Sequence, residues 1–80
     1  MRLDKFLKVS RLIKRRTIAK EISDNGRVFV NDKLAKPSLE VKVGDVITLN
    51  LNSRVIKARI LELKDYVKQE EASQMYEIIE

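Results

Sequence analysis

The apolar residues change their spacing at Asn25-Gly26, and this change limits the folds that the 80-residue chain can adopt. Before Gly26 they recur at the spacing of an amphipathic helix, about 3.6 residues, and after it they alternate at the spacing of a strand, about two residues. Gly26 can take the left-handed conformation that follows a helix end. The chain should therefore fold as an α+β domain, with a helical part followed by a small sheet.

Residues 3–13 are predicted to form the first helix, because one side of their helical wheel is apolar and the opposite side is charged. The apolar side consists of Leu3, Phe6, Leu7, Ser10 and Ile13, and the charged side consists of Asp4, Lys5, Lys8 and Arg11. We expect the first side in the core and the second in solvent.

A second helix is predicted from about Thr17 to Asp24, after a short basic connection at residues 14–16. Its apolar stripe consists of Ile18, Ala19 and Ile22, and another side carries Arg16, Lys20 and Ser23. Since both helices are short and closely joined, we expect them to pack as a hairpin.

Four short strands are predicted after Gly26, spanning residues 27–30, 33–35, 46–51 and 54–60. The first two should be joined at Asn31-Asp32, since both residues tolerate positive φ. The last two should be joined at Asn52-Ser53. The basic residues of the last strand would suit an edge strand that is kept soluble by charge.

Positive charge is concentrated in residues 1–36, which carry eleven basic and four acidic side chains, a net charge of +7. Residues 37–80 carry six basic and eight acidic side chains, a net charge of −2. A one-sided basic surface attracts polyanions, because neutralised phosphates release counterions. We therefore predict a nucleic acid partner rather than a merely solvated face. The candidate contacts are Arg2, Lys5, Lys8, Arg11, Lys14, Arg15, Arg16, Lys20 and Arg27.

The few aromatic residues indicate which kind of nucleic acid is bound. Phe6 and Phe29 lie on apolar faces and are assigned to the core, which argues against a stacking platform for single strands. The pattern favours a structured RNA that is recognised through its shape and its phosphates.

Histidine and cysteine are absent, which removes the commonest general acid–base group, the commonest metal ligand and any disulfide. The carboxylates are dispersed, and the two glycines belong to no phosphate-binding loop. The sequence therefore predicts no catalysis, no metal and no cofactor. No apolar run approaches the roughly 18 residues of a membrane helix, and the N-terminus does not resemble a signal peptide. We expect a cytoplasmic protein.

Residues 64–80 differ from the rest, with two lysines against five carboxylates and a net charge of −3. Ala72, Met75, Tyr76 and Ile79 fall at helical spacing, so we expect a helix or a partly ordered tail. We favour packing of these residues on the sheet over docking on a partner protein. The acidic charge should keep this extension away from the RNA-binding surface.

Four segments in this order resemble the S-four-type RNA-binding domain, also called the αL motif: residues 2–7 (RLDKFL), 16–20 (RTIAK), 25–31 (NGRVFVN) and 43–45 (VGD). The resemblance covers about residues 1–51. It implies a helical hairpin packed on a small, bent antiparallel sheet, with structured rRNA or tRNA bound by the hairpin. Many members have Ser or Thr at the position of Arg15, and many have Asn-Gly where this chain has Asn31-Asp32. We place the domain at residues 1–63 and an acidic extension at residues 64–80.

Within that family, the start of the chain and the segment around residues 68–76 look like small bacterial proteins of ribosome-associated quality control. This resemblance implies binding to stalled large ribosomal subunits, through their rRNA and peptidyl-tRNA. It also implies support of C-terminal alanine tailing by a partner protein that brings alanyl-tRNA. A role in heat-shock recycling of large subunits and a basic protein-interaction adapter are the alternatives. We expect a monomer when the protein is free.

Overall fold

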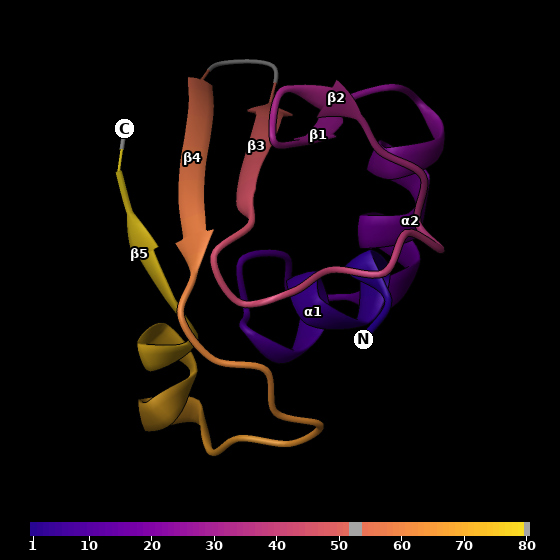
Figure 1. The fold of residues 1–80 in the computed structure, drawn as a ribbon. Coiled ribbons are helices and arrows are strands. Elements are labelled where there is room, and N and C mark those ends of the chain that lie inside the picture. Colours follow the sequence, from indigo (N-terminus) through magenta and orange to yellow (C-terminus); the bar gives the residue numbers. More distant parts are fainter. Residues whose placement is uncertain (52–53, 80) are drawn as a thin grey trace.

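The computed structural model describes residues 1–51 and 54–79, and in it two helices pack on a five-stranded antiparallel sheet (Figure 1). The elements are α1 (Leu3–Val9), α2 (Arg16–Asp24), β1 (Val28–Val30), β2 (Lys33–Leu34), β3 (Val46–Leu51), β4 (Arg54–Ile60), the 3₁₀ helix η1 (Gln69–Met75) and β5 (Tyr76–Ile78). The strands are ordered β2-β1-β3-β4-β5, and each pairs antiparallel with its neighbours. The predicted α+β fold is confirmed.

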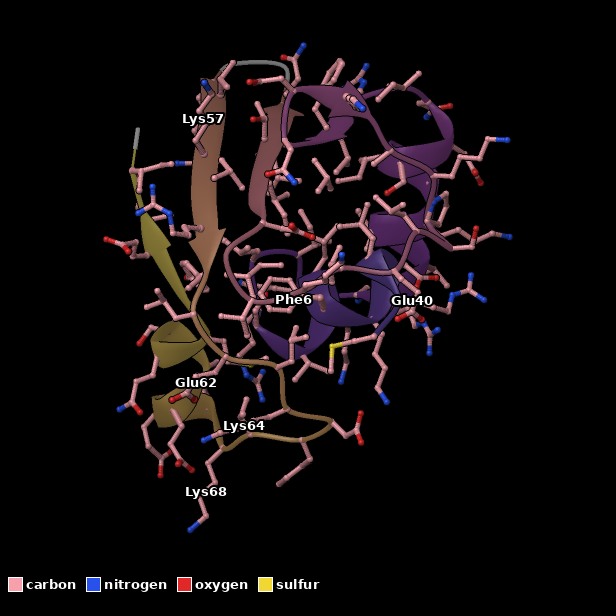
Figure 2. All side chains as sticks on the ribbon, in the orientation of Figure 1. Phe6, Glu40, Lys57, Glu62, Lys64 and Lys68 are labelled. Atoms are coloured by element: carbon pink, nitrogen blue, oxygen red, sulfur yellow. The ribbon has the colours of Figure 1, made fainter. Side chains whose placement is uncertain are left out.

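The start of α1 is held by the loop that precedes β3. The amide groups of Leu3 and Asp4 donate to the carbonyl oxygens of Leu39 and Pro37, at 2.8 and 3.1 Å. These bonds satisfy amides that have no partner within the helix. The amino group of Met1 lies 3.0 Å from the Glu40 carboxylate (Figure 2). The entry of the helix is therefore fixed by residues almost forty positions later in the chain.

The first helix ends four residues earlier than predicted. Ser10 is its C-cap, and Arg11 has φ 63°, in the left-handed region. The Arg11 amide donates to the Lys8 carbonyl and the Ile13 amide to the Leu7 carbonyl, which satisfies two carbonyl groups of the last turn. The helical wheel was correct for the buried residues Leu3, Phe6, Leu7 and Ser10, but the periodicity did not show the reversal at Arg11.

The second helix begins at Arg16, one residue before the predicted start, and Arg15 occupies the N-cap position in extended conformation without a side-chain cap. Its buried face is formed by Ala19 and Ser23, and the Ser23 hydroxyl donates to the Ala19 carbonyl at 2.8 Å. Ile18, predicted to be in the core, is 42% exposed. Ile18 lies about 100° around the helix from Ala19, so it points away from the face that Ala19 and Ser23 bury.

The predicted turns and strands are largely confirmed. Asn31 and Asp32 have φ 53° and 67° and connect β1 to β2, as their tolerance of positive φ predicted. The predicted turn at Asn52-Ser53 lies outside the described residues. The edge-strand interpretation of β4 is wrong, because β5 covers its free side with pairs such as Ala58 with Ile78.

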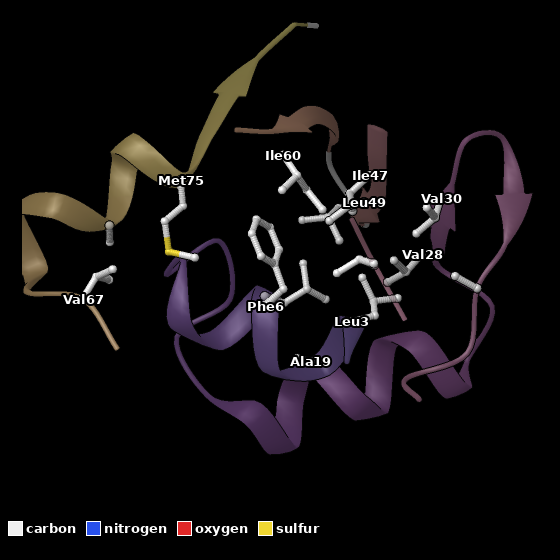
Figure 3. Packing of buried hydrophobic residues seen from close by; sticks show 14 residues of the cluster. Leu3, Phe6, Ala19, Val28, Val30, Ile47, Leu49, Ile60, Val67 and Met75 are labelled. Atoms are coloured by element: carbon white, nitrogen blue, oxygen red, sulfur yellow. The ribbon is translucent and has the colours of Figure 1, made fainter. Parts of the chain in front are cut away.

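One hydrophobic cluster joins the helices, the sheet and the C-terminal segment (Figure 3). Phe6 of α1 is fully buried beside Leu3, while Val67 and Met75 reach the cluster from residues 61–79. Phe29 follows Val28 in β1 and so points to the opposite face of the sheet, where it is half-buried rather than part of this core.

The acidic extension is built into the fold instead of forming a separate tail. Ala72 and Met75 are buried, as the favoured packing interpretation predicted, whereas Ile79 is 38% exposed. The helix predicted here is a 3₁₀ helix that gives way to strand β5 at Tyr76. Directly after this helix the chain pairs with β4, beginning with Tyr76 opposite Ile60.

Candidate nucleic-acid interface

A buried carboxylate connects the two helices at the centre of the basic surface. Asp4 is only 3% exposed, although the helical wheel placed it on the solvent side. Arg2 donates to both of its oxygens, from Nε to Oδ1 at 3.2 Å and from Nη2 to Oδ2 at 3.3 Å. Arg16 Nη2 lies 3.5 Å from Oδ1, and the Lys5 amide donates to the same oxygen at 2.8 Å. The solvent prediction failed because two guanidinium groups cover this carboxylate.

This arrangement brings together Arg2, the N-cap of α1, and Arg16, the first residue of α2. Their side chains are 48% and 50% exposed. A guanidinium group carries five N–H donors, so each arginine keeps donors that can reach an anion in solvent. One carboxylate offsets one of the two positive charges, and the pair retains a net charge of +1. Asp4 thus holds two arginines in a fixed orientation without neutralising them.

The other predicted contacts on the helical hairpin are exposed to solvent. Lys8, Arg11, Lys14, Arg15 and Lys20 are exposed. Within residues 1–51 and 54–79, none of these five side chains has an ion-pair or hydrogen-bond partner. They extend the positive surface along α1, the connection after it and the first turns of α2.

Two predicted contacts differ from the others. Arg27 is half-buried and already makes an interaction within the protein. It follows the C-terminal end of α2, whereas Arg16 is the first residue of that helix. A nine-residue helix spans about 13 Å, so the structure does not bring these two arginines together. Lys5 is paired with Asp65, with Nζ 2.9 Å from Oδ1.

The Lys5–Asp65 contact places the acidic extension against α1. The sequence predicted that this extension is not part of the RNA-binding surface, and Asp65 of the extension lies against the basic helix α1. A shallow depression lies here, lined by Lys8, Val9, Arg11, Asp65, Tyr66 and Val67. The hydrogen bond from the Lys5 ammonium, together with its charge, holds the pKa of Asp65 below its ordinary value. In Figure 2 the segment that carries Glu62, Lys64 and Lys68 runs along the lower side of the molecule, below α1.

Tyr66 is the residue of this surface that the sequence reasoning missed. It is 81% exposed beside the basic side of α1. Its sequence signal is weak: a single aromatic residue in a stretch with neither helical nor strand periodicity. Elsewhere, in the part of the chain that the structure describes, no cluster of acidic side chains could hold a metal ion. No helix described there has the length and apolarity to cross a membrane.

Comparisons with known proteins agree with this fold. The S4 domain family matches residues 1–47. A protein of Bacillus subtilis named "RQC P-site tRNA stabilizing factor" is 54% identical over 79 residues, which cover 99% of this chain and 92% of that protein. Its namesake in Streptococcus pneumoniae is 53% identical over 79 residues, covering 99% and 90%. The solved structure of Vibrio cholerae heat shock protein 15 matches with a TM-score of 0.91 at 34% identity, covering 99% of this chain and 81% of that one.

The fold and the basic helical surface define an RNA-binding module, and the chain belongs to the S4 domain family, among the relatives named RQC P-site tRNA stabilizing factors. These stabilizing factors are RNA-binding proteins of ribosome quality control. They are not catalytic, as the sequence predicted.

Proposed function

We propose that the protein stabilises the P-site tRNA of stalled ribosomes by binding large subunits that carry peptidyl-tRNA. Its RNA partners are the rRNA of the large subunit and the peptidyl-tRNA. It needs no cofactor and catalyses no step. A partner protein that brings alanyl-tRNA adds C-terminal alanines while the tRNA is held. In this role the protein works in the cytoplasm, and it is a monomer when free. Near-full-length similarity to factors of that name supports the proposal.

The observation that carries the proposal is the pair of arginines on Asp4. Arg2 and Arg16 are oriented before any RNA arrives, and each is about half exposed. Guanidinium groups bind phosphate in a bidentate geometry, and a fixed orientation lowers the entropy lost on binding. This pair would recognise a phosphate of structured RNA, and the surrounding cations would add less specific phosphate contacts.

The proposed RNA-binding residues are those named from the sequence: Arg2, Lys5, Lys8, Arg11, Lys14, Arg15, Arg16, Lys20 and Arg27. We further propose that residues 1–63 contain the RNA-binding domain and that residues 64–80 serve as an extension that shares its core. Val67, Ala72 and Met75 support this shared core, since they are buried in the same cluster as Phe6.

Sedimentation with purified large subunits that carry peptidyl-tRNA tests the proposal. Arg16→Ala should weaken binding more than any other single cation change. Arg59→Ala is the matched control, because Arg59 is 45% exposed and also ion-paired, with Glu77 at 3.3 Å, but it lies on β4 away from the helices. Each lost phosphate contact should flatten the slope of log K against log salt by about 0.7–0.9. Equal binding by the two variants would refute the proposed interface.

Recycling of large subunits after heat shock is the second candidate, and the structural similarity to heat shock protein 15 favours it. The higher identity to the quality-control factors makes it the weaker one. An alanine-tailing reaction with purified components distinguishes the two, since only the first function requires this protein for tail formation. Binding that survives ribonuclease treatment would instead indicate a protein-interaction adapter.

A further inference from the structure

The depression between α1 and the extension combines an exposed aromatic ring with basic side chains. Lys8, Val9 and Arg11 line one side, and Asp65, Tyr66 and Val67 line the other, around a volume of about 70 Å³. That space is too small to enclose a nucleobase. A planar group could instead lie over the rim, where the Tyr66 ring is 81% exposed.

The backbone at Tyr66 is held in place by the residues on either side of it. Asp65 is tied to Lys5 of α1 at 2.9 Å, and Val67 is buried in the core with 8% exposure. The backbone at Tyr66 is therefore anchored on both sides, while its side chain stays in solvent. An aromatic ring gains stability from burial, so this position leaves the ring available to a binding partner.

The cations opposite the ring have the properties of a phosphate-binding pair. Lys8 and Arg11 are exposed, and in residues 1–51 and 54–79 their side chains have no charged or hydrogen-bonded partner. Arg11 also has φ 63°, a conformation that glycine adopts freely and that strains an arginine. Strained residues of this kind cluster at functional sites. The sharp turn at Arg11 points the chain out of α1 beside the depression.

We propose that Tyr66, Lys8 and Arg11 form a stacking site for one unpaired nucleotide of the bound RNA, an inference that rests on the proposed function. The base stacks on the tyrosine ring, and its phosphate lies between the two cations. Lys8 and Arg11 lie on the α1 side of the depression, so the sugar–phosphate chain is directed toward α1. A flat ring beside two cations suits a nucleotide better than an acidic peptide, which would use the charges and leave the ring unoccupied.

The test uses two synthetic RNAs, a stem with a single-nucleotide bulge and the same stem fully paired, with binding measured by fluorescence anisotropy. Stacking of one base should give the full-length protein a preference for the bulged stem of about five-fold or more. Tyr66→Ala should abolish the preference, and Tyr66→Phe should keep it. Ile78→Ala is the control, because Ile78 is 56% exposed on β5 away from the depression.

Tyrosine fluorescence gives a second readout, because the chain has no tryptophan and only two tyrosines. In a Tyr76→Phe variant the emission comes from Tyr66 alone. The bulged stem should quench it more strongly than the paired stem, as stacking requires.

The outcomes separate this site from the proposed function. Arg16→Ala should weaken binding of both RNAs by the same factor, since it serves the phosphates. If the wild-type protein binds both RNAs equally, or Tyr66→Ala retains the preference, the stacking site is refuted and the proposed function stands. If the wild type binds neither RNA, the stacking site is refuted, while the proposed function is decided by the sedimentation with large subunits. If Tyr66→Ala keeps the preference for the bulged stem but no longer supports the alanine-tailing reaction, the ring contacts a protein instead, and the inference is overturned.

Discussion

Replacing Asp4 with asparagine would test the contact on which both the hairpin and the candidate RNA interface depend. The substitution keeps the size and planar shape of the side chain and removes its negative charge. Asparagine also replaces one acceptor oxygen with an NH₂ donor, which would face guanidinium donors of Arg2 or Arg16. The Lys5 amide can still donate to the remaining oxygen, so the start of α1 keeps that bond.

The expected loss of stability follows from the contacts and their exposure. Removing one partner of a buried ion pair costs about 3–5 kcal/mol, and a single hydrogen bond to a charged group contributes about 1.5–3 kcal/mol. The Asp4 side chain is 4% exposed, but the arginines are about half exposed and regain water when the pair is broken. We therefore expect Asp4→Asn to lower the free energy of unfolding by about 2–3 kcal/mol. A domain of this size has about 4–12 kcal/mol in total.

Thermal unfolding followed by circular dichroism should show a fall in Tm of roughly 10–20 °C. Asp65→Asn is the matched control, since it removes an exposed carboxylate from Lys5 and should lower Tm far less than Asp4→Asn does. At temperatures where Asp4→Asn is folded, it should also bind large subunits less tightly than Asp65→Asn, because Arg2 and Arg16 are no longer oriented. A Tm within about 3 °C of the wild type would refute the role of Asp4 at the helix junction.

Three further predictions follow from burial, charge and the C-terminal packing. Phe6→Ala should cost about 3–5 kcal/mol in an unfolding titration, whereas Ile18→Ala, at a 42% exposed position, should cost far less, and the reverse order would contradict the observed core. The Asp65 pKa, measured by NMR titration, should lie below its ordinary value and rise in Lys5→Gln. Because the pKa of Asp65 is lowered in the folded protein, the stabilisation by this ion pair is present above the ordinary pKa and is lost as the pH falls through the lowered pKa. An Asp65 pKa that is unchanged in Lys5→Gln would mean that the pair does not form in solution. Removing residues 68–80 should lower Tm and expose the edge of β4, and unchanged melting would show that the extension adds nothing to the core.

The sequence predicted which residues of the candidate site are charged, but it did not predict how their side chains are oriented. The cations were found because charge is a property of composition, and their clustering in residues 1–36 is visible without a structure. The orientation of Arg2 and Arg16 was not found, because it depends on a carboxylate that the helical wheel placed in solvent. Tyr66 was missed because its position beside Lys8 depends on a contact between residues 60 positions apart, Lys5 and Asp65.

The sequence by itself determined the features that depend on a few neighbouring residues. The periodicity before Asn25 predicted both helices, and the positive φ tolerated by Asn31 and Asp32 predicted the β1–β2 turn. Such features follow from backbone sterics and from the burial of one face, which act within one or two turns of chain.

The tertiary structure alone decided which segments meet. It buried Asp4 under two guanidinium groups and paired β5 with β4, which removed the expected edge. Each of these outcomes balances solvation, strain and pairing between residues that are distant in sequence, so no local pattern encodes it. The acidic extension was predicted from its composition to lie outside the RNA-binding surface, and the structure shows an ion pair and a shared core that hold part of it against α1.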